Sequence, residues 1–180
     1  LDANTTGSYN TALGGLALSA NTTASNNVAV GYAALQVNTT GTGNIGIGNY
    51  SLDANTTANY NTAIGDYALS ENTTGAENTS VGKNSLDANT TGSYNTASGY
   101  NSLSSNTTAD KNVAFGYYAL NINTTGANNT ALGTQALQVN TTGTQNVAVG
   151  AYALDANTTA ANNTGIGYAA LGANTTGTQN

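Results

Sequence analysis

A repeat of seventeen residues, with no insertion or deletion, is the feature that most constrains the fold of this chain. Asn-Thr-Thr begins at Asn4 and recurs with this period up to Asn174, each time shortly after a Leu, as Leu1 precedes Asn4. Numbered from that Leu, each full repeat has Asn at positions 4 and 10 and Gly at position 14. The 180 residues comprise ten full repeats and ten further residues. Because loops of globular folds tolerate changes in length, a fixed period indicates a stacked coil in which every residue has a set place.

The repeat length and the composition favour a parallel β-solenoid (β-roll), an all-β fold with one coil, or rung, per repeat. A helical solenoid needs two helices, and so roughly 30 residues or more, in each repeat. The chain contains 30 Asn, 32 Thr and 22 Gly, residue types that disfavour a helix. Rungs about 4.8 Å apart would stack into a rod on the order of 50 Å long. We therefore expect a single repeat domain over residues 1–180, and we interpret it as an internal segment of a longer fibre.

Each rung is predicted to contain two short strands. The first runs from position 10 to position 14, as in Asn27–Gly31, where alternation places Val28 and Val30 on one face and Ala29 on the other. The second is expected around positions 17 and 1, where a small residue precedes Leu. We expect the Leu column and the aliphatic column at position 13 to form the core. The repeated residues that should form structural ladders include Leu18, Leu35, Leu52, Leu69, Gly14, Gly31, Gly48, Gly65, Asn10, Asn27, Asn44 and Asn61.

Two further features of the rung follow from its repeated residues. The Gly at position 14 is expected to have a positive φ or to lack room for a Cβ atom. Asn-Thr-Thr is expected to form a turn, because Asn tolerates the left-handed conformation and hydrogen-bonds to its own backbone. Stacked Asn side chains should also hydrogen-bond along the axis. Tyr50 with Tyr67, and Tyr100 with Tyr117, are one repeat apart, and we predict that each pair stacks.

Both faces of the first strand carry small or apolar residues, whereas a thin coil has only one interior. The other face therefore predicts a second layer, most simply neighbouring copies of the chain in a trimer or a laterally packed filament. The alternative is that threonines make this face compatible with water. These threonines are Thr11, Thr62, Thr79, Thr96, Thr130 and Thr164.

The composition argues against several functional classes. Charged residues make up 6% of the chain, against roughly 25% in an ordinary soluble domain, and the net charge is −6. The only basic residues, Lys83 and Lys111, form no patch for nucleic acid. His and Cys are absent and the acids are scattered, so we expect no catalytic residue, no cofactor and no metal site. No stretch of about 18 apolar residues occurs, so membrane insertion is not expected.

Every Asn-Thr-Thr also matches the N-glycosylation sequon Asn-x-Thr. One interpretation is a line of glycans along one edge of the rod, and the other is a structural turn that happens to match the sequon. Glycans on rungs about 4.8 Å apart would be very crowded, which favours the turn. The candidate sites are Asn4, Asn21, Asn38, Asn55, Asn72, Asn89, Asn106, Asn123, Asn140, Asn157 and Asn174.

The stacked Thr-Thr pairs suggest an alternative function. From Thr5 and Thr6 to Thr175 and Thr176 they would form hydroxyl and methyl arrays that resemble the ice-binding faces of solenoid antifreeze proteins. Consecutive residues of a strand point to opposite faces, so a flat array would be expected to use Thr-x-Thr instead. An ice- or glycan-binding module that uses Thr ladders is therefore the alternative to a structural role.

The repeat resembles those of bacterial and phage surface proteins. Asn27–Leu35 (Asn-Val-Ala-Val-Gly-Tyr-Ala-Ala-Leu) and Asn44–Leu52 are similar to the head repeats of trimeric autotransporter adhesins. The whole chain is also similar to the NTAxGxxALxxNTTG repeats of bacterial surface proteins and phage tail-fibre-like proteins. The resemblance implies a left-handed roll, a trimer and a location outside the cell or on a cell or virion surface. The repeat unit of this chain is longer than the adhesin head repeat, and the chain contains no family binding motif from which site residues could be transferred.

These observations together lead to one functional expectation. We expect a non-catalytic, extracellular fibre or filament segment that serves surface extension, display or adhesion. Its expected partners are copies of itself, with surface glycans as a further candidate.

Overall fold

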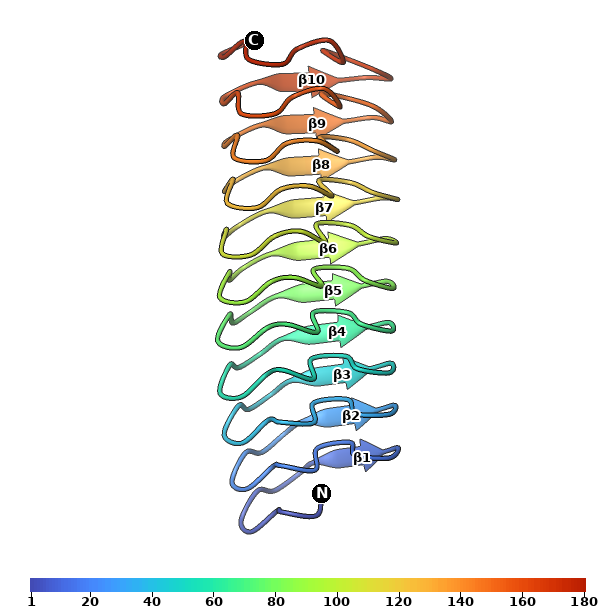
Figure 1. Cartoon of the computed structure of the whole chain (residues 1–180), viewed down its shortest axis with the longest axis vertical. Coiled ribbons are helices and arrows are strands. Elements are labelled where there is room, and N and C mark those ends of the chain that lie inside the picture. Colours follow the sequence, from blue (N-terminus) through green and yellow to red (C-terminus); the bar gives the residue numbers. More distant parts are fainter.

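The computed structural model describes all 180 residues and shows the parallel β-solenoid predicted from the repeat. The chain coils upward by one rung per repeat, and its strands stack on one side of the coil from β1 to β10 (Figure 1). Neighbouring strands pair in parallel with an offset of one repeat, so that Ala12 lies opposite Ala29. The same offset relates Gly165 of β10 to Ala148 of β9. One repeat is therefore one coil, which is compatible with the repeat type that the sequence resembles.

Each strand is three residues long and occupies positions 11 to 13 of its repeat. The strands are β1 (Thr11–Leu13), β2 (Val28–Val30), β3 (Ile45–Ile47), β4 (Thr62–Ile64), β5 (Thr79–Val81), β6 (Thr96–Ser98), β7 (Val113–Phe115), β8 (Thr130–Leu132), β9 (Val147–Val149) and β10 (Thr164–Ile166). Positions 11 and 13 are mostly Thr, Val and Ile, whose branched side chains favour extended backbone. The Gly that follows ends each strand.

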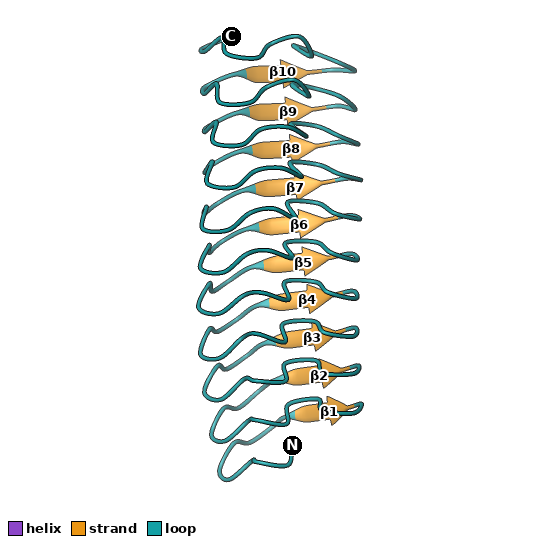
Figure 2. Cartoon of the chain, viewed as in Figure 1, coloured by secondary structure: helices purple, strands orange, loops and turns teal.

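Each rung contains one strand, so the prediction of two strands is wrong. The strands form a single column, and the rest of each rung consists of turns and loops (Figure 2). At position 1 the Leu residues from Leu18 to Leu171 have φ between 49° and 54°, a left-handed conformation that a strand cannot contain. Neighbouring rungs are nevertheless hydrogen-bonded here, since the Leu35 N–H donates to the Ser51 carbonyl at 3.0 Å.

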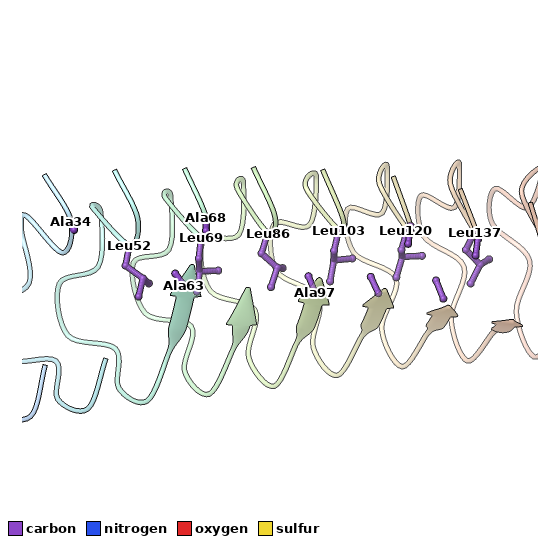
Figure 3. Close-up of a cluster of buried hydrophobic side chains, with 14 of the residues drawn as sticks. Ala34, Leu52, Ala63, Ala68, Leu69, Leu86, Ala97, Leu103, Leu120 and Leu137 are labelled. Carbon is purple, nitrogen blue, oxygen red and sulfur yellow. The ribbon is translucent and has the colours of Figure 1, made fainter. Parts of the chain in front are cut away.

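A column of leucines fills the interior of the coil. The nine leucines from Leu18 to Leu154 at position 1 are completely buried. They pack with small residues at positions 12 and 17, and Figure 3 shows Leu52 to Leu137 in a row beside Ala63, Ala68 and Ala97. Burial of one leucine side chain contributes about 1.5–3 kcal/mol, so this column is a main source of hydrophobic stabilisation.

The aliphatic column at position 13 lies outside the coil, which corrects the prediction that it belongs to the core. Ile47, Ile64 and Leu132 expose 37–38% of their surface, while the small residue at position 12 of the same strands faces the interior. The reason is the width of the interior. At Gly46, which occupies position 12, an added Cβ atom would lie 3.0 Å from Ser51 Oγ and 3.4 Å from the Cγ atom of Leu35. The coil therefore has room for one leucine facing one methyl group.

Positive φ angles recur at positions 1, 9, 14 and 16. At position 14, Gly82 has a φ of 126°, and a Cβ atom there would lie 2.6 Å from the carbonyl oxygen of Gly99, so both expected reasons for Gly apply. The Asn of Asn-Thr-Thr does not have a positive φ, contrary to expectation. It closes a turn differently, since the Asn38 N–H donates to the Leu35 carbonyl at 3.3 Å. The Leu three residues earlier, rather than the Asn, takes the left-handed conformation, as Leu35 does with a φ of 50°.

Candidate interaction surfaces

The asparagines of Asn-Thr-Thr form a continuous hydrogen-bonded ladder inside the coil. Asn89 illustrates the pattern: its Nδ2 donates to Asn72 Oδ1 on the preceding rung at 2.9 Å, and to the Gly92 carbonyl at 2.9 Å. Its Oδ1 accepts a hydrogen bond from Asn106 Nδ2 at 2.8 Å. The nine asparagines of this column from Asn21 to Asn157 are completely buried. Buried amides are stable when all their donors and acceptors are bonded, as they are here.

This geometry bears on the candidate glycosylation sites, which are the same asparagines. An N-linked glycan is attached to Nδ2 and replaces one of its hydrogens, whereas both hydrogens are donated within the ladder, as at Asn55 (2.8 and 3.2 Å). The attached sugar would also have to leave a completely buried position. The structure therefore gives each Asn-Thr-Thr of the inner rungs a structural role, and the line of glycans stays the alternative interpretation.

The second asparagine column, at position 10, joins each rung to both of its neighbours. The Asn61 N–H donates to Asn44 Oδ1 at 2.9 Å, and Asn61 Oδ1 accepts from the Asn78 N–H at 2.9 Å. Asn61 Nδ2 donates to the Gly75 carbonyl on the next rung at 2.9 Å. The nine members of this column from Asn27 to Asn163 are completely buried. They hold the backbone in place directly before each strand.

The two threonine columns differ in their exposure. At position 5 the side chains from Thr22 to Thr158 are half-buried, and each hydroxyl donates to the same position on the next rung, as Thr73 Oγ1 does to the Thr90 carbonyl at 3.0 Å. At position 6 the side chain is exposed on every rung, from Thr6 to Thr176. Only one of the two threonine columns therefore faces solvent.

The side chains at positions 11 and 13 of β1 to β10 form a surface that we call the outward sheet face. Position 13 carries exposed Leu, Ile, Val or Phe on most rungs, including Phe115 at 45% exposure. Phe115 pairs with Ser98 on the neighbouring strand. Both side chains lie outside the coil, so this pairing of a large ring with a small serine does not affect the packing of the core. Ten stacked strands thus present a continuous surface with Thr, Val or Ile at position 11 and mostly apolar side chains at position 13.

Eight of the eleven tyrosines lie at positions 15 and 16, just after the Gly that ends each strand. We call the surface that they form the tyrosine edge. They are Tyr32, Tyr50, Tyr67, Tyr100, Tyr117, Tyr118, Tyr152 and Tyr168. The two stacks predicted from the spacing are present. The rings of Tyr50 and Tyr67 have centroids 5.0 Å apart, those of Tyr100 and Tyr117 are 5.7 Å apart, and both pairs have an interplanar angle of 16°.

Asp53, at position 2, is a half-buried acid whose ionisation is altered by its surroundings. Partial burial raises the pKa of its carboxyl group to about 6, and the negative charges of Glu71 and Asp87 act in the same direction. Hydrogen bonds from the backbone N–H groups of Asp53 and Ala54 oppose this shift in pKa. The repulsion arises because successive rungs bring acids of different repeats close together.

The surface of the rod has no pocket, and no three His, Cys, Asp or Glu side chains are grouped so that they could hold a metal ion. No helix is present that is long and apolar enough to cross a bilayer. The surface is therefore distinguished by three features: the exposed threonine column, the outward sheet face and the tyrosine edge.

No known protein family, no curated protein and no solved structure matches this chain.

Proposed function

We propose that this chain is a segment of an extracellular structural fibre that serves surface extension, display or adhesion. The axial hydrogen-bond network is the observation that carries the proposal. Each inner rung is joined to the next by the two buried asparagine columns, the threonines at position 5 and the backbone of the sheet. Such nearest-neighbour bonding makes the length of a solenoid proportional to the number of its repeats, and it joins every rung firmly to the next.

The outward sheet face supports the second part of the proposal, which is association between copies of the chain. Monomeric proteins rarely expose a continuous apolar surface larger than a few hundred Å². Here nine of the ten strands present an apolar side chain at position 13, and Ser98 of β6 is the exception. Copies of the chain that face each other with this surface would cover the side chains that the narrow interior excludes.

The resemblance to the head repeats of trimeric autotransporter adhesins favours three copies, and the resemblance to tail-fibre-like repeats favours a cell or virion surface. Both inferences come from the sequence pattern in Asn27–Leu35 and Asn44–Leu52. The fold is compatible with them, because it is a solenoid with one rung per repeat.

Sedimentation velocity over a range of concentrations tests the proposal, together with negative-stain electron microscopy. We expect straight rods and a mass of about three times 17.8 kDa. A single species of 17.8 kDa at all concentrations would contradict association, and globular particles in the micrographs would contradict the fibre itself.

A second candidate function is ice binding by the threonine column at position 6. One observation favours it: the threonine is exposed on every rung, without substitution, so that the side chains repeat at the spacing of a β-sheet, about 4.8 Å. Thermal hysteresis and ice-crystal shaping are the measurements that check it. Activity that disappears in a Thr74→Lys, Thr91→Lys variant would support ice binding, and freezing behaviour equal to that of an inert protein of the same mass would exclude it.

A further inference from the structure

We propose that the tyrosine edge is a binding surface for a linear, uncharged polysaccharide that lies along the rod axis. The inference deepens the proposed surface function, on which it rests, because it names the class of molecule that such a fibre would hold. The grouping of the rings, their backbone conformation, the polar residues beside them and the charge of the edge carry it.

The rings are grouped in three clusters along the edge. Tyr32, Tyr50 and Tyr67 lie on three consecutive rungs, with the first pair edge-to-face at 5.4 Å and the second stacked. Tyr100, Tyr117 and Tyr118 form a second cluster with centroid distances between 4.5 and 5.7 Å. Tyr152 and Tyr168 form a third, edge-to-face at 5.8 Å. A molecule that touches all three clusters must be long and must follow the axis.

The backbone conformation at position 16 disfavours tyrosine, so conformational propensity does not explain the four tyrosines that occur there. Position 16 has a positive φ on every full rung, and Tyr50, Tyr67, Tyr118 and Tyr152 have φ between 54° and 61°. For a bulky residue this left-handed conformation is strained. Asn, which tolerates it, occupies the same position at Asn84 with a φ of 54°. The leucines at position 1 offset a similar strain by filling the core, whereas these tyrosines are half-buried or exposed and pack against other rings of the edge.

Polar side chains lie between and beside the clusters. Lys83 and Asn84 separate the first cluster from the second, and Thr134 and Gln135 separate the second from the third. Asn101, on the rung of Tyr100, has the only buried side-chain oxygen without a hydrogen-bond partner, its Oδ1. This amide therefore keeps an acceptor that no group of the chain itself uses. The edge thus offers flat rings and hydrogen-bonding groups in alternation.

The charge and the spacing of the edge select an uncharged polysaccharide. Asp66 and Lys83 are the only charged residues among positions 15 and 16, and the chain as a whole has a net charge of −6, which disfavours polyanions. Tyrosine combines a flat apolar ring with a hydroxyl, which suits the apolar face and the equatorial hydroxyls of a pyranose. Rungs are about 4.8 Å apart, and a pyranose residue of an extended chain advances by a similar distance, so successive sugars can meet successive rungs.

Affinity gel electrophoresis tests the proposal, with hydroxyethyl cellulose, a soluble mixed-linkage β-glucan, galactomannan and dextran as neutral probes and alginate as the anionic probe. We expect at least one neutral polysaccharide to retard the chain and alginate to leave its mobility unchanged. A chain that none of the neutral probes retards overturns the proposal, and so does retardation by alginate alone.

The variant Tyr100→Asn, Tyr117→Asn, Tyr118→Asn removes the second cluster with residues that the chain itself uses at these positions, Asn49 at position 15 and Asn84 at position 16. We expect it to weaken retardation at least about tenfold. The control variant Tyr60→Asn, Tyr94→Asn removes exposed rings at position 9, outside the edge, and should bind like the original chain. Equal weakening in both variants, or in neither, overturns the assignment to the edge.

The length of the polysaccharide gives an independent readout. A long sugar chain that is bound at one tyrosine cluster has a raised effective concentration at the next cluster, whereas a short one is not long enough to reach it. We expect oligosaccharides of two or three sugars to compete at least about tenfold more weakly, per sugar, than long chains. Equal competition per sugar would contradict binding along the axis. If no polysaccharide retards the chain, and the second-cluster variant no longer self-associates, the edge would instead be a contact surface between copies of the chain. The fibre proposal is tested separately, since rods that associate but bind no polysaccharide would leave it intact.

Discussion

The interior and the outward sheet face of this solenoid invert the usual distribution of side chains. The interior contains two columns of completely buried asparagines beside the leucines, whereas the outward face presents Val, Ile, Leu and Phe to solvent. Buried amides are acceptable because each Asn finds partners on the neighbouring rungs, as Asn89 does with Asn72 and Asn106. A repeated polar residue thus satisfies itself by stacking, which a single buried Asn in a globular core cannot do.

Residues repeat for different reasons in the interior and on the outward sheet face. The interior asparagines repeat because each one is hydrogen-bonded to the equivalent residue of the next rung, and the leucines repeat because each rung has the same narrow interior to fill. Residues of the outward face need only be suited to a strand, so Thr, Val and Ile exchange freely at position 11. We therefore expect substitutions inside the coil to affect folding and substitutions outside it to affect association.

The largest effect is expected from breaking the amide ladder. Asn89→Ala removes two donated hydrogen bonds and one accepted bond, and it leaves Asn72 Oδ1 without a donor. The Gly92 carbonyl keeps one hydrogen bond, from Asn78 Nδ2, and the Asn106 amide keeps one, to the Ala109 carbonyl. We expect the free energy of unfolding to fall by about 3–5 kcal/mol, measured by urea denaturation. The control Thr91→Ala, in the exposed column of the same rung, should change it by less than about 0.5 kcal/mol. A loss below about 1 kcal/mol in Asn89→Ala would show that the ladder contributes little.

A methyl group at the strand end should have the next largest effect. In Gly82→Ala the new Cβ atom would lie 2.6 Å from the Gly99 carbonyl oxygen, on a residue with a φ of 126°. We expect a loss of about 2–4 kcal/mol in the free energy of unfolding. Gly15→Ala is the matched control, because its Cβ atom would meet only the Tyr32 ring, at 3.3 Å, and its φ is not positive. Similar thermal midpoints for the two variants would contradict the tight backbone contact.

A smaller effect is expected from the carboxyl group of Asp53, whose pKa in the folded chain is raised to about 6. The folded chain binds this proton more tightly than the unfolded chain, in which the pKa is near 4, so its contribution to stability is full below pH 4 and is lost as the pH rises through 6. We expect thermal midpoints to fall between pH 4 and pH 7. The variant Asp53→Asn should show a weaker dependence over this range and a higher midpoint at pH 7 than the original chain. An unchanged pH dependence would exclude Asp53 as its source.

The outward sheet face should contribute least to the folding of a single chain. Ile64→Ser with Val81→Ser exchanges exposed aliphatic residues for a residue that Ser98 already represents in this column. Because both side chains are partly buried, we expect the free energy of unfolding of the isolated chain to fall by about 1–2 kcal/mol, and association to weaken at least about tenfold in sedimentation equilibrium. Association that persists unchanged would place the contact between copies on another surface.

No effect at all is expected from deglycosylation. Because the amide nitrogens of the inner Asn-Thr-Thr segments are buried and fully bonded, native material should have the mass of the bare polypeptide before and after glycosidase treatment. Intact-mass spectrometry measures this directly. A mass excess that the enzyme removes would show that sugars are attached before the coil closes.

The sequence by itself determined the architecture along the axis. The uninterrupted period of the repeat implies one rung per repeat, and with it the parallel register, the asparagine ladders and the stacks of Tyr50 with Tyr67 and Tyr100 with Tyr117. These features follow because residues one repeat apart must lie above one another in any regular coil.

Only the tertiary structure decided the arrangement across the axis. Alternation shows that Ala29 and Val30 lie on opposite faces of a strand, but it does not show which face is inside. That choice depends on the distance across the coil, which the left-handed leucines at position 1 make short enough to admit a methyl group and to exclude a larger side chain. The same turns remove the second strand from each rung and bring the asparagines into the interior. The width of the coil depends on contacts between its opposite sides, and the repeat pattern alone does not show which residues make these contacts.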